Sequence, residues 1–319
     1  MVEKVTENKL NQEKKAFDKQ ILERVKNGHI PDLRNAVRNE WFYNNVWRDP
    51  EYLKLSFIEN LNYFLKFIKS NSNILEVGCG PGHISLELAR NNHFVRGIDL
   101  SPECIEVAKV TANNNKFKDT FGSLEYDCGD FLNIDFPKNN FDAVLFYGSL
   151  SHFEKIDIVL DKVSWILKPN GRILVYDTSV DQYDDGDAAI LYMMCAILSF
   201  TGHFYKNEVI AKDYNQIDTE VSIKLNNLKF VDSKDQKIQS PNDNSQYYND
   251  MINAFKKRFN KVKFSWESSF FQNIIGGIRF STIEDEHQLA NFIKQIESYL
   301  IKNGKISPAF FRYIGENVD

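Results

Sequence analysis

Three glycines at alternate positions, Gly78, Gly80 and Gly82, mark the part of this sequence best suited to hold a small ligand. They lie in the segment 75–82, which reads LEVGCGPG and stands between a short apolar run and a helical pattern. Glycine lets a chain turn sharply and approach a ligand closely, because it has no Cβ. The start of the following helix offers free N–H groups to a negatively charged group. The segment therefore predicts a ligand-binding turn, with a tight turn that holds no ligand as the simpler alternative.

The spacing of the glycines decides between two kinds of nucleotide site. A dinucleotide site requires GxGxxG, and His83 stands where the third glycine of that fingerprint belongs. The pattern is instead Glu76-x-Gly78-x-Gly80-x-Gly82, which resembles motif I of the class I S-adenosylmethionine (SAM)-dependent methyltransferases. Further motifs of that family follow in order, over about residues 73–178: GIDLS at 97–101, GDF at 129–131, FDAV at 141–144 and LKPNGR at 167–172. Asn170 replaces a glycine in the last motif, and asparagine tolerates the same left-handed backbone.

The resemblance implies a site for S-adenosyl-L-methionine, with S-adenosyl-L-homocysteine as the product. Asp99 stands at the end of a predicted strand, where a carboxylate can accept both ribose hydroxyls. Leu100 is expected to pack on adenine, Asp130 to accept a hydrogen bond from its amino group, and Phe131 to lie beside the ring. Glu76 is expected either to order the loop or to meet the methionine ammonium. The expected cofactor-binding residues are Glu76, Gly78, Cys79, Gly80, Gly82, Asp99, Leu100, Asp130, Phe131, Tyr147 and Gly148.

Two side chains after the fourth predicted strand are candidate catalytic residues. Tyr147 stands where the family places the methionine part of the cofactor and the reacting methyl group. His152 follows it, and its imidazole could deprotonate an acceptor hydroxyl or amine as a general base. The alternative is that His152 only lines the cofactor site, because methyl transfer from a sulfonium often needs alignment and desolvation alone. No histidine or cysteine spacing in the chain is typical of a metal site.

Strands and helices alternate through residues 73–178, as a parallel sheet with crossover helices requires. Strands are predicted at 73–77, 93–99, 123–128, 141–146 and 172–176, and helices at 84–90, 102–113 and 156–167. The nearly all-apolar fourth strand indicates helices on both faces. We predict an α/β fold with a doubly wound, mostly parallel, seven-stranded sheet of the class I methyltransferase type. N-terminal helices precede this sheet, and a largely helical cap is inserted after the fifth strand.

The chain divides into four predicted segments. These are an N-terminal helical segment (1–70), a SAM-binding Rossmann-like core (71–180), a cap or substrate insertion (181–270), and a C-terminal helix and strand that complete the core (271–319). In the last two segments, helices are predicted at 187–200, 250–259 and 283–302, and strands at 219–225, 261–266 and 308–314. The acidic stretch 181–187 is predicted to be a mobile loop with a hinge at Gly186.

The acceptor site must come from segments outside the core motifs. Residues 36–50 and 183–206 are rich in aromatic and apolar side chains, which suit a small-molecule pocket. The candidate substrate-binding residues are Trp41, Tyr43, Trp47, Tyr192, Met193 and His203. We expect both segments to border a cavity that faces the 147–152 loop. The alternative is that the apolar helix at 188–200 forms a contact between subunits, remote from the cofactor.

Composition narrows the choice of partners. The 319 residues carry 39 basic and 44 acidic side chains, and this net charge of −5 argues against a nucleic-acid-binding surface. Five basic residues cluster within 256–263, but such a run is more often a solvated helix face. The longest apolar run, 188–198, is about half a bilayer span, and no apolar leader begins the chain. Four separated cysteines fit a reducing compartment. We expect a soluble cytoplasmic protein, a monomer or homodimer, with no membrane partner.

These features predict a SAM-dependent methyltransferase. Its methyl group would pass by in-line displacement to an oxygen, nitrogen or carbon atom of a small molecule, in specialised metabolism. A protein or peptide side chain and RNA remain alternative acceptors, and an open groove would favour the protein or peptide. A subunit that binds the cofactor without turnover also remains open, and an acceptor path blocked by Tyr147 or the 188–200 helix would favour it.

Overall fold

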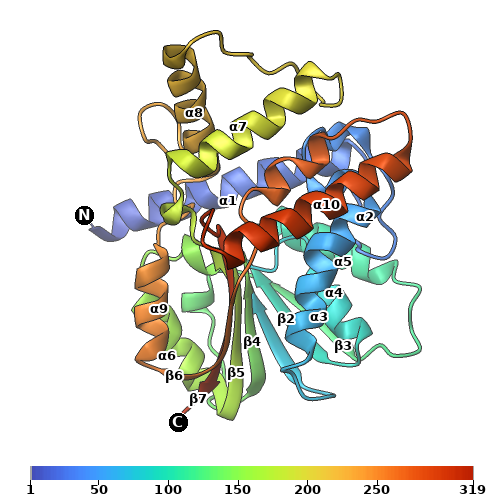
Figure 1. Ribbon diagram of the computed structural model, residues 1–319. Coiled ribbons are helices and arrows are strands. Elements are labelled where there is room, and N and C mark those ends of the chain that lie inside the picture. The colour runs from blue at the N-terminus through green and yellow to red at the C-terminus, as the bar shows by residue number, and fades with distance from the viewer. Residues whose placement is uncertain (1, 319) are drawn as a thin grey trace.

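The computed structural model describes residues 2–318; Met1 and Asp319, at the ends of the first and last predicted segments, lie outside that range. Its centre is a seven-stranded sheet in the order β3-β2-β1-β4-β5-β7-β6 (Figure 1). Strands β1 to β5 pair in parallel, and β7 lies antiparallel between β5 and β6. The predicted fold class is confirmed. The strands are β1 (Asn73–Val77), β2 (Phe94–Asp99), β3 (Ser123–Cys128), β4 (Phe141–Tyr147), β5 (Leu167–Thr178), β6 (Phe259–Trp266) and β7 (Phe310–Asn317).

Helices cover both faces of this sheet, which explains why its central strands are apolar. Ile74 and Leu145 pack with residues of α3 and α4, while Val144 and Val175 pack with residues of α6 and α9 on the opposite face. Successive side chains of a strand point to opposite faces, so a strand between two helical layers is apolar at every position. The helices are α1 (Val2–Lys26), α2 (Pro50–Leu53), α3 (Glu59–Leu65), α4 (His83–Arg90), α5 (Pro102–Asn113), α6 (Ile156–Ile166), α7 (Asp185–Phe200), α8 (Tyr214–Leu228), α9 (Tyr248–Lys256) and α10 (Ile283–Lys302).

Strand β5 begins earlier than predicted and includes the LKPNGR segment. Leu167 pairs with Phe141, and the register shifts between Phe141 and Ala143. Asn170 has a φ of 59°, the left-handed backbone expected of a residue that takes the place of glycine. The turn predicted before the fifth strand is therefore an irregularity within the strand.

The cap consists of α7 and α8, which pack against each other beyond the carboxyl edge of the sheet (Figure 1). The strand predicted at 219–225 is wrong, because these residues lie in α8. Apolar and polar residues alternate there as in a strand, but the buried positions are Val221, Lys224 and Leu228. That spacing is helical, and contact with α7 selects it over the short alternating pattern. The predicted cap also extends too far, since residues 248–266 form α9 and β6 of the sheet layers.

The acidic stretch 181–187 starts a helix instead of forming a hinged loop. The carboxylate of Asp184 accepts the N–H groups of Gly186 and Asp187, and the Asp187 side chain accepts the N–H of Asp184. Buried Asp187 also accepts the N–H of Ser307 at 2.8 Å. Free N–H groups at a helix start stabilise carboxylates, which offsets their mutual repulsion. Gly186 therefore lies in the first turn of α7, and the predicted hinge is corrected.

The N-terminal helix α1 crosses the molecule between the cap and the carboxyl edge of the sheet (Figure 1). It packs against α5 on the way. Short 3-10 turns at Glu40–Phe42 and Val46–Arg48 and a π-helical turn at Lys54–Ile58 lead on to α3. No helix within residues 2–318 is long and apolar enough to cross a bilayer.

Candidate functional site

The glycine loop joins β1 to α4 at the carboxyl edge of the sheet. Gly78 and Cys79 donate their N–H groups to the carbonyl of Ile98, at 2.8 and 2.9 Å, which anchors the loop to β2. Gly78 and Gly80 have φ angles of 73° and 52°, in the left-handed region that favours glycine. A Cβ on Gly78 would meet the Ser149 side chain at 2.4 Å, whereas a Cβ on Gly80 would point into open space. The loop is therefore closed on the β4 side and open at Gly80.

Asp99 ends β2 and faces the glycine loop. Its carboxylate accepts the N–H of Gly80 at 2.7 Å and the N–H of Ser101 at 2.8 Å. Burial raises the pKa of this carboxyl, and the two hydrogen bonds oppose that effect. A carboxylate has about four acceptor positions, so two remain for the hydroxyls of a ribose. The structure places Asp99 beside the open side of the loop, and its ribose contacts stay a prediction.

Glu76 lies beneath the loop and is 2% exposed. It accepts a hydrogen bond from the hydroxyl of Ser85, in the first turn of α4. Burial raises the pKa of Glu76 to about 8, so the side chain is largely neutral at pH 7. A neutral carboxyl that ties β1 to α4 favours the loop-ordering role over a contact with a methionine ammonium.

Asp130 and Phe131 follow β3. Asp130 lies at the edge of the sheet, and the side chain of Phe131 lies in the core. The Asp130 carboxylate accepts the N–H of Leu132 at 3.0 Å and the side-chain amide of Asn133 at 2.9 Å, and so caps a 3-10 turn. Phe131 is 2% exposed and packs against Phe146 and other rings of the core. The structure corrects the expected position of this ring beside adenine, because burial in the apolar layer is the more favourable environment.

The end of β4 abuts the glycine loop. Ser149 donates its hydroxyl to the carbonyl of Val77 at 2.6 Å, and Gly148 donates its N–H to the carbonyl of Tyr176 at 2.7 Å. Gly148 has a φ of 67°, and a Cβ there would also point into open space. Gly80 and Gly148 thus leave room at the two places where the backbone can approach a ligand, and Asp99 borders the first of them.

Tyr147 is enclosed by aromatic rings. Its ring lies 4.7 Å from that of Tyr176 and 5.7 Å from that of Phe57, centroid to centroid. The phenol oxygen accepts the side-chain amide of Asn60 at 3.3 Å. Burial raises the pKa of Tyr147 well above its ordinary value, so the phenol stays neutral and keeps a proton to donate.

His152 lies between α1 and the segment that precedes α9. Its Nδ1 is 2.8 Å from a carboxylate oxygen of Glu13, and its Nε2 is 3.8 Å from one of Asp243. Burial alone would lower the pKa of His152, but Glu13 and the charges of Asp243 and Asp177 raise it above 6.5. A raised pKa keeps the ring protonated over more of the neutral range, which opposes a general-base role there.

Sequence reasoning missed the three carboxylates around this imidazole. Glu13 is 4% exposed and also accepts the hydroxyl of Ser240 at 2.8 Å. Asp177 is fully buried and accepts the N–H groups of Leu150 and Ser151. Asp243 is 5% exposed, and one of its oxygens has no hydrogen-bond partner. The polar run SPNDNS at 240–245 was the available signal, but nothing in the sequence indicates that it meets α1.

Helix α1 is held over the carboxyl edge by polar contacts near both donor-side motifs. Asp18 accepts the hydroxyl of Ser101, two residues after Asp99 in the chain, at 2.5 Å. Glu13, one and a half turns earlier, holds His152. The helix therefore forms the cover of this edge, a role that the sequence assigned to residues 36–50 and 183–206.

The predicted substrate-binding residues of segment 36–50 are partly at the site. Trp47 is buried against Phe57 and His83, and Phe57 stacks on Tyr147. Trp41 is half-buried against neighbouring aromatic residues, while Tyr43 is 61% exposed. Of these three residues, only Trp47 is connected to Tyr147, through the ring of Phe57.

The predicted residues of segment 183–206 make their contacts within the cap or with residues 278–280. The phenol of Tyr192 donates to the carbonyl of Val209 at 2.7 Å. His203 stacks on Phe280 at 4.1 Å, and Met193 is 53% exposed. None of these contacts is with the 147–152 loop, and the substrate-binding role of the three residues stays a prediction.

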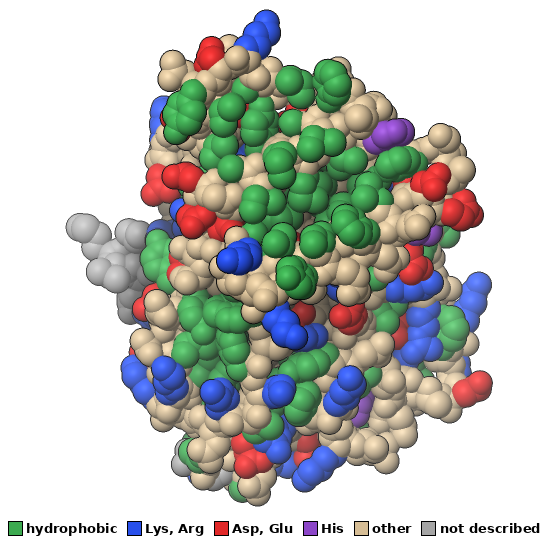
Figure 2. All heavy atoms as spheres, in the orientation of Figure 1, with side chains coloured by type: hydrophobic (Ala, Val, Ile, Leu, Met, Phe, Trp, Pro, Cys, Tyr) green, Lys and Arg blue, Asp and Glu red, His purple; other side chains and the backbone are tan. Residues whose placement is uncertain are grey.

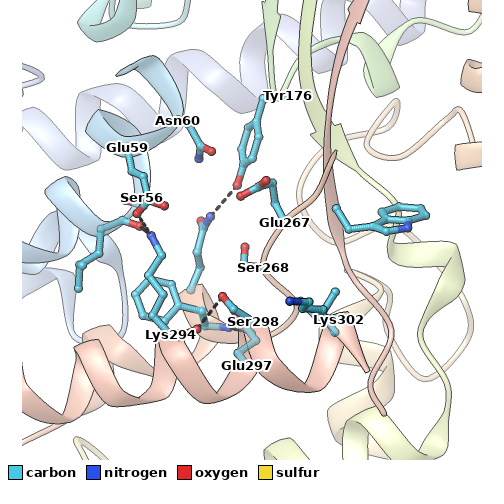
Figure 3. A pocket seen from close by; sticks show the side chains of 15 residues that line it. Ser56, Glu59, Asn60, Tyr176, Glu267, Ser268, Lys294, Glu297, Ser298 and Lys302 are labelled. Carbon is cyan, nitrogen blue, oxygen red and sulfur yellow. Dashed lines mark hydrogen bonds and ion pairs between the residues drawn. The ribbon is translucent and has the colours of Figure 1, made fainter. Parts of the chain in front are cut away.

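A cavity of about 310 Å³ lies beside Tyr176, between α3, α10 and the segment after β6 (Figure 3). Its inner wall carries polar side chains: Asn60 holds the phenol of Tyr147, and Gln272 donates to the phenol of Tyr176 at 3.1 Å. Glu267 is paired with Arg312, and Lys294 with Glu59, so most charges at the wall are already balanced. The lining residues are Leu55, Ser56, Glu59, Asn60, Tyr176, Trp266, Glu267, Ser268, Phe271, Gln272, Lys294, Glu297, Ser298, Ile301 and Lys302.

Comparison with known proteins agrees with this geometry. Residues 68–216 match a family model described as a methyltransferase domain. The sterol 24-C-methyltransferase of Neurospora crassa is 30% identical over 148 residues, which cover 46% of this chain and 36% of that protein. Methyltransferase GfsG of Streptomyces halstedii is 25% identical over 186 residues, 53% of this chain and 64% of that protein. The chain spans less than half the length of the sterol methyltransferases that it matches.

Among solved structures, a candidate sarcosine dimethylglycine methyltransferase from Galdieria sulphuraria has the same fold. It superposes with a TM-score of 0.51 at 14% identity, over 94% of this chain and 97% of that one. Together with the motif order and the sheet order, the matches assign residues 68–216 to the class I SAM-dependent methyltransferases. The chain carries a methyltransferase domain of this class, and the predicted family, enzyme class and cofactor are confirmed at that level.

The residues present fit the cofactor of that class. Gly80 and Gly148 leave the open space that a Cβ would fill, and Asp99 keeps acceptor positions beside it. Leu100 is half-buried at the same edge, and Asp130 lies at the end of the next strand. These positions would hold, in order, the methionine part, the ribose and the adenine.

Proposed function

We propose that this chain transfers a methyl group from S-adenosylmethionine to an oxygen, nitrogen or carbon atom of a small molecule. The observation that carries the proposal is the cradle formed by Gly80 and Gly148 beside Asp99. When bound, the cofactor supplies an electrophilic methyl group on a sulfonium. The chain's own task is then to hold the acceptor in line with that methyl group and to exclude water.

The acceptor would enter the cavity beside Tyr176, whose ring lies 4.7 Å from that of Tyr147. The volume of about 310 Å³ suits a small molecule. We place Tyr147 between this cavity and the cradle, because Asn60 of the cavity wall donates to its phenol and Gly148 of the cradle follows it in the chain. A neutral phenol at that position can donate a hydrogen bond to the acceptor and orient it. Tyr147 is therefore our candidate for the residue that positions the reacting atom.

His152 takes a positioning role in this proposal. Its contacts with Glu13 and Asp243 support a link between α1 and the edge of the sheet, beside the cofactor. The positive charge of a protonated imidazole also opposes the rise in the pKa of Asp99 that burial causes. We propose that an amine or an ionised hydroxyl reacts without a base in the chain: the C–S bond breaks as the new bond to the methyl carbon forms, and the extra proton of a methylated amine is lost to water.

The names of the relatives support a small-molecule acceptor but do not identify the acceptor of this chain. Several are named for transfer to carbon 24 of sterols, which are small molecules. The cavity wall of this chain offers the hydroxyl and amide groups of Ser56, Asn60, Ser268 and Gln272. Such a wall matches an acceptor with several polar groups better than a sterol skeleton, because buried polar groups need partners.

RNA is the weaker alternative acceptor. The basic cluster within 256–263 is partly neutralised, since Arg258 pairs with Asp157 and Asp161, and Lys257 also pairs with Asp157. Residues paired in this way contribute less to binding phosphates.

Titration calorimetry with S-adenosylmethionine and with S-adenosylhomocysteine tests the cofactor site. We expect both to bind, and binding of neither would refute the proposal. Incubation with methyl-labelled S-adenosylmethionine and an extract of the source organism tests the reaction. Label in small molecules supports the proposal, label in protein or RNA assigns the other acceptors, and binding without any labelled product supports a subunit that does not turn over.

A further inference from the structure

Lys162, on α6, is arranged unlike the exposed lysines of this protein. Figure 2 shows Lys and Arg side chains spread over one face of the molecule, where their charged ends meet water. The ammonium of Lys162 instead donates to three backbone carbonyls, those of Phe131 at 2.7 Å, Leu132 at 3.0 Å and Ile134 at 2.5 Å. A lysine ammonium has three donors, and these contacts use all of them. A single side chain of α6 therefore fixes the turn 131–134, which follows β3.

Aromatic rings also hold the Lys162 ammonium beside this turn. It lies 5.1 Å from the centre of the Phe131 ring and 5.4 Å from that of the Phe136 ring, within the range of cation–π attraction. Both rings pack in the same apolar cluster as the buried side of α6. Burial lowers the pKa of Lys162, and the charges of Asp135 and Asp130 oppose this effect. The ammonium is therefore held on the core side of the turn.

The same turn sets the direction of the Asp130 carboxylate. One oxygen of this carboxylate accepts the N–H of Leu132 at 3.0 Å, and the other accepts the side-chain amide of Asn133 at 2.9 Å. Leu132 is bound twice, through its N–H by Asp130 and through its carbonyl by Lys162. The backbone carbonyl of Asp130 also accepts the N–H of Asn133 at 2.9 Å. A displacement of the turn would therefore move the carboxylate with it.

We propose that Lys162 is a positioning residue that holds the Asp130 carboxylate where it distinguishes adenine from other bases. The inference rests on the proposed function, because it takes Asp130 as the acceptor for the adenine amino group. An acceptor fixed in one direction discriminates between a ligand that offers a donor there and one that does not. Hypoxanthine, the base of inosine, carries an oxygen in place of the adenine amino group and offers no donor at that position.

A purely structural role of Lys162 would have a different result. Removal of the ammonium leaves three carbonyls without this donor, which is costly for buried groups. If that cost were spread through the fold, binding of every ligand at the donor edge would weaken alike. If the change is confined to the turn, only contacts with the base should weaken, because Gly80 is held by Asp99 and Gly148 by Tyr176.

Calorimetry with S-adenosylhomocysteine and with its inosine analogue tests the proposal. Lys162→Met removes the ammonium and keeps an apolar stem. We expect its affinity for S-adenosylhomocysteine to fall by about fivefold, and its affinity for the inosine analogue to stay within about twofold of that of the natural protein. Lys168→Met is the matched control, since Lys168 pairs with Asp142 near the start of β4, and it should leave both affinities unchanged.

A double variant shows whether Lys162 acts through Asp130. In a protein that already carries Asp130→Ala, Lys162→Met should have no further effect on the preference for the adenosyl compound, because the group that it positions is gone. Additive losses would overturn the proposal, and so would a folded Lys162→Met protein that keeps the full preference.

Lys162→Arg decides the question if Lys162→Met does not fold. Arginine keeps the positive charge, but its planar donor fork does not match three converging carbonyls. The preference for the adenosyl compound should therefore fall by about twofold in Lys162→Arg, and an unchanged preference would overturn the proposal.

Hydrogen exchange in the free protein separates the role of Lys162 from the proposed function. The Leu132 N–H, which binds Asp130, should exchange at least about tenfold faster in Lys162→Met. Unchanged exchange would overturn the proposal whether or not the cofactor binds. A natural protein that binds neither S-adenosylmethionine nor S-adenosylhomocysteine would refute the proposed function and with it the adenine assignment. A natural protein that binds both, together with a variant that retains the base preference, would refute only the role of Lys162.

Discussion

The donor edge of the sheet and the proposed acceptor cavity are built in different ways. At the donor edge, Gly80, Asp99 and Gly148 are placed by backbone hydrogen bonds between neighbouring parallel strands. The cavity is enclosed by α3, β5, α10 and the segment after β6, which are far apart in the chain. A local site is fixed once its strands pair, whereas a site between distant elements depends on the packing of the whole chain. The donor edge should therefore respond to single substitutions in a way that can be foreseen residue by residue.

Removal of Asp99 is the most severe test of this difference. Asp99→Ala should weaken binding of S-adenosylhomocysteine by about 100-fold or more, because two charge-assisted hydrogen bonds of about 1.5–3 kcal/mol each are lost. Calorimetry measures the affinity, and circular dichroism checks the fold, since Asp99 also holds the N–H groups of Gly80 and Ser101. Asp99→Asn keeps one acceptor and should lie between the two. Unchanged affinity in folded Asp99→Ala would refute the ribose assignment.

Two glycines with the same backbone geometry separate strain from contact with the cofactor. Gly80 and Gly304 have φ angles of 52° and 61°, and a Cβ on either would meet nothing within 4 Å. Alanine at each should lower the free energy of unfolding by about 1 kcal/mol through the left-handed backbone. Only Gly80→Ala should also weaken cofactor binding, by about tenfold, because its methyl group enters the cradle. If Gly80→Ala and Gly304→Ala bound the cofactor with equal affinity, Gly80 would not lie at the cofactor site.

Asp130 should contribute less than Asp99, since it is assigned one hydrogen bond to adenine. Asp130→Ala should weaken binding of S-adenosylhomocysteine by about fivefold, the equivalent of about 1 kcal/mol. Its effect should be specific to the base. The natural protein should prefer the adenosyl compound over its inosine analogue, and the variant should not. If Asp130→Ala still preferred the adenosyl compound, other groups of the protein would bind the adenine amino group.

The smallest expected effect concerns the cover formed by α1. Glu13→Gln should lower the pKa of His152, measured by NMR titration, because the nearest negative charge is removed. Because its pKa is raised in the folded state, protonated His152 stabilises the fold below pH 6.5. This contribution is lost as the pH rises through the raised pKa of His152. The lowered pKa of Glu13 stabilises the fold above pH 4.5 and ceases to do so as the pH falls through the lowered value.

The cost of Glu13→Gln should therefore be largest near pH 5.5, at about 1 kcal/mol in urea unfolding. It should shrink towards both higher and lower pH. Glu23→Gln, also on α1, is the control and should show no such maximum, since Glu23 has no described contact with His152. If the free energy of unfolding lost in Glu13→Gln did not change with pH over this range, the titration of His152 would not depend on its contact with α1.

Much of the fold could be predicted because its signals are short. The glycines, Asp99 and the apolar strands each occupy a few consecutive residues, and parallel pairing brings their carboxyl ends to one edge. Errors arose where a short pattern has two solutions. The alternating residues 219–225 fit a strand as well as a helix, and only contact with α7 selects the helix. The acidic run 181–187 looked repulsive until its place at a helix start was known.

The sequence by itself determined the donor edge, because side chains spaced along β1 to β4 and joined by backbone hydrogen bonds need no distant partner. Only the tertiary structure decided what lies over and beside that edge. It brought Glu13 and Asp243 to His152 from distant parts of the chain, turned Phe131 into the core, and formed a cavity beside α10. These outcomes depend on which apolar faces pack together, and apolar surface is attracted to any other apolar surface without direction. Which apolar surfaces pack together therefore depends on the shape of the whole molecule.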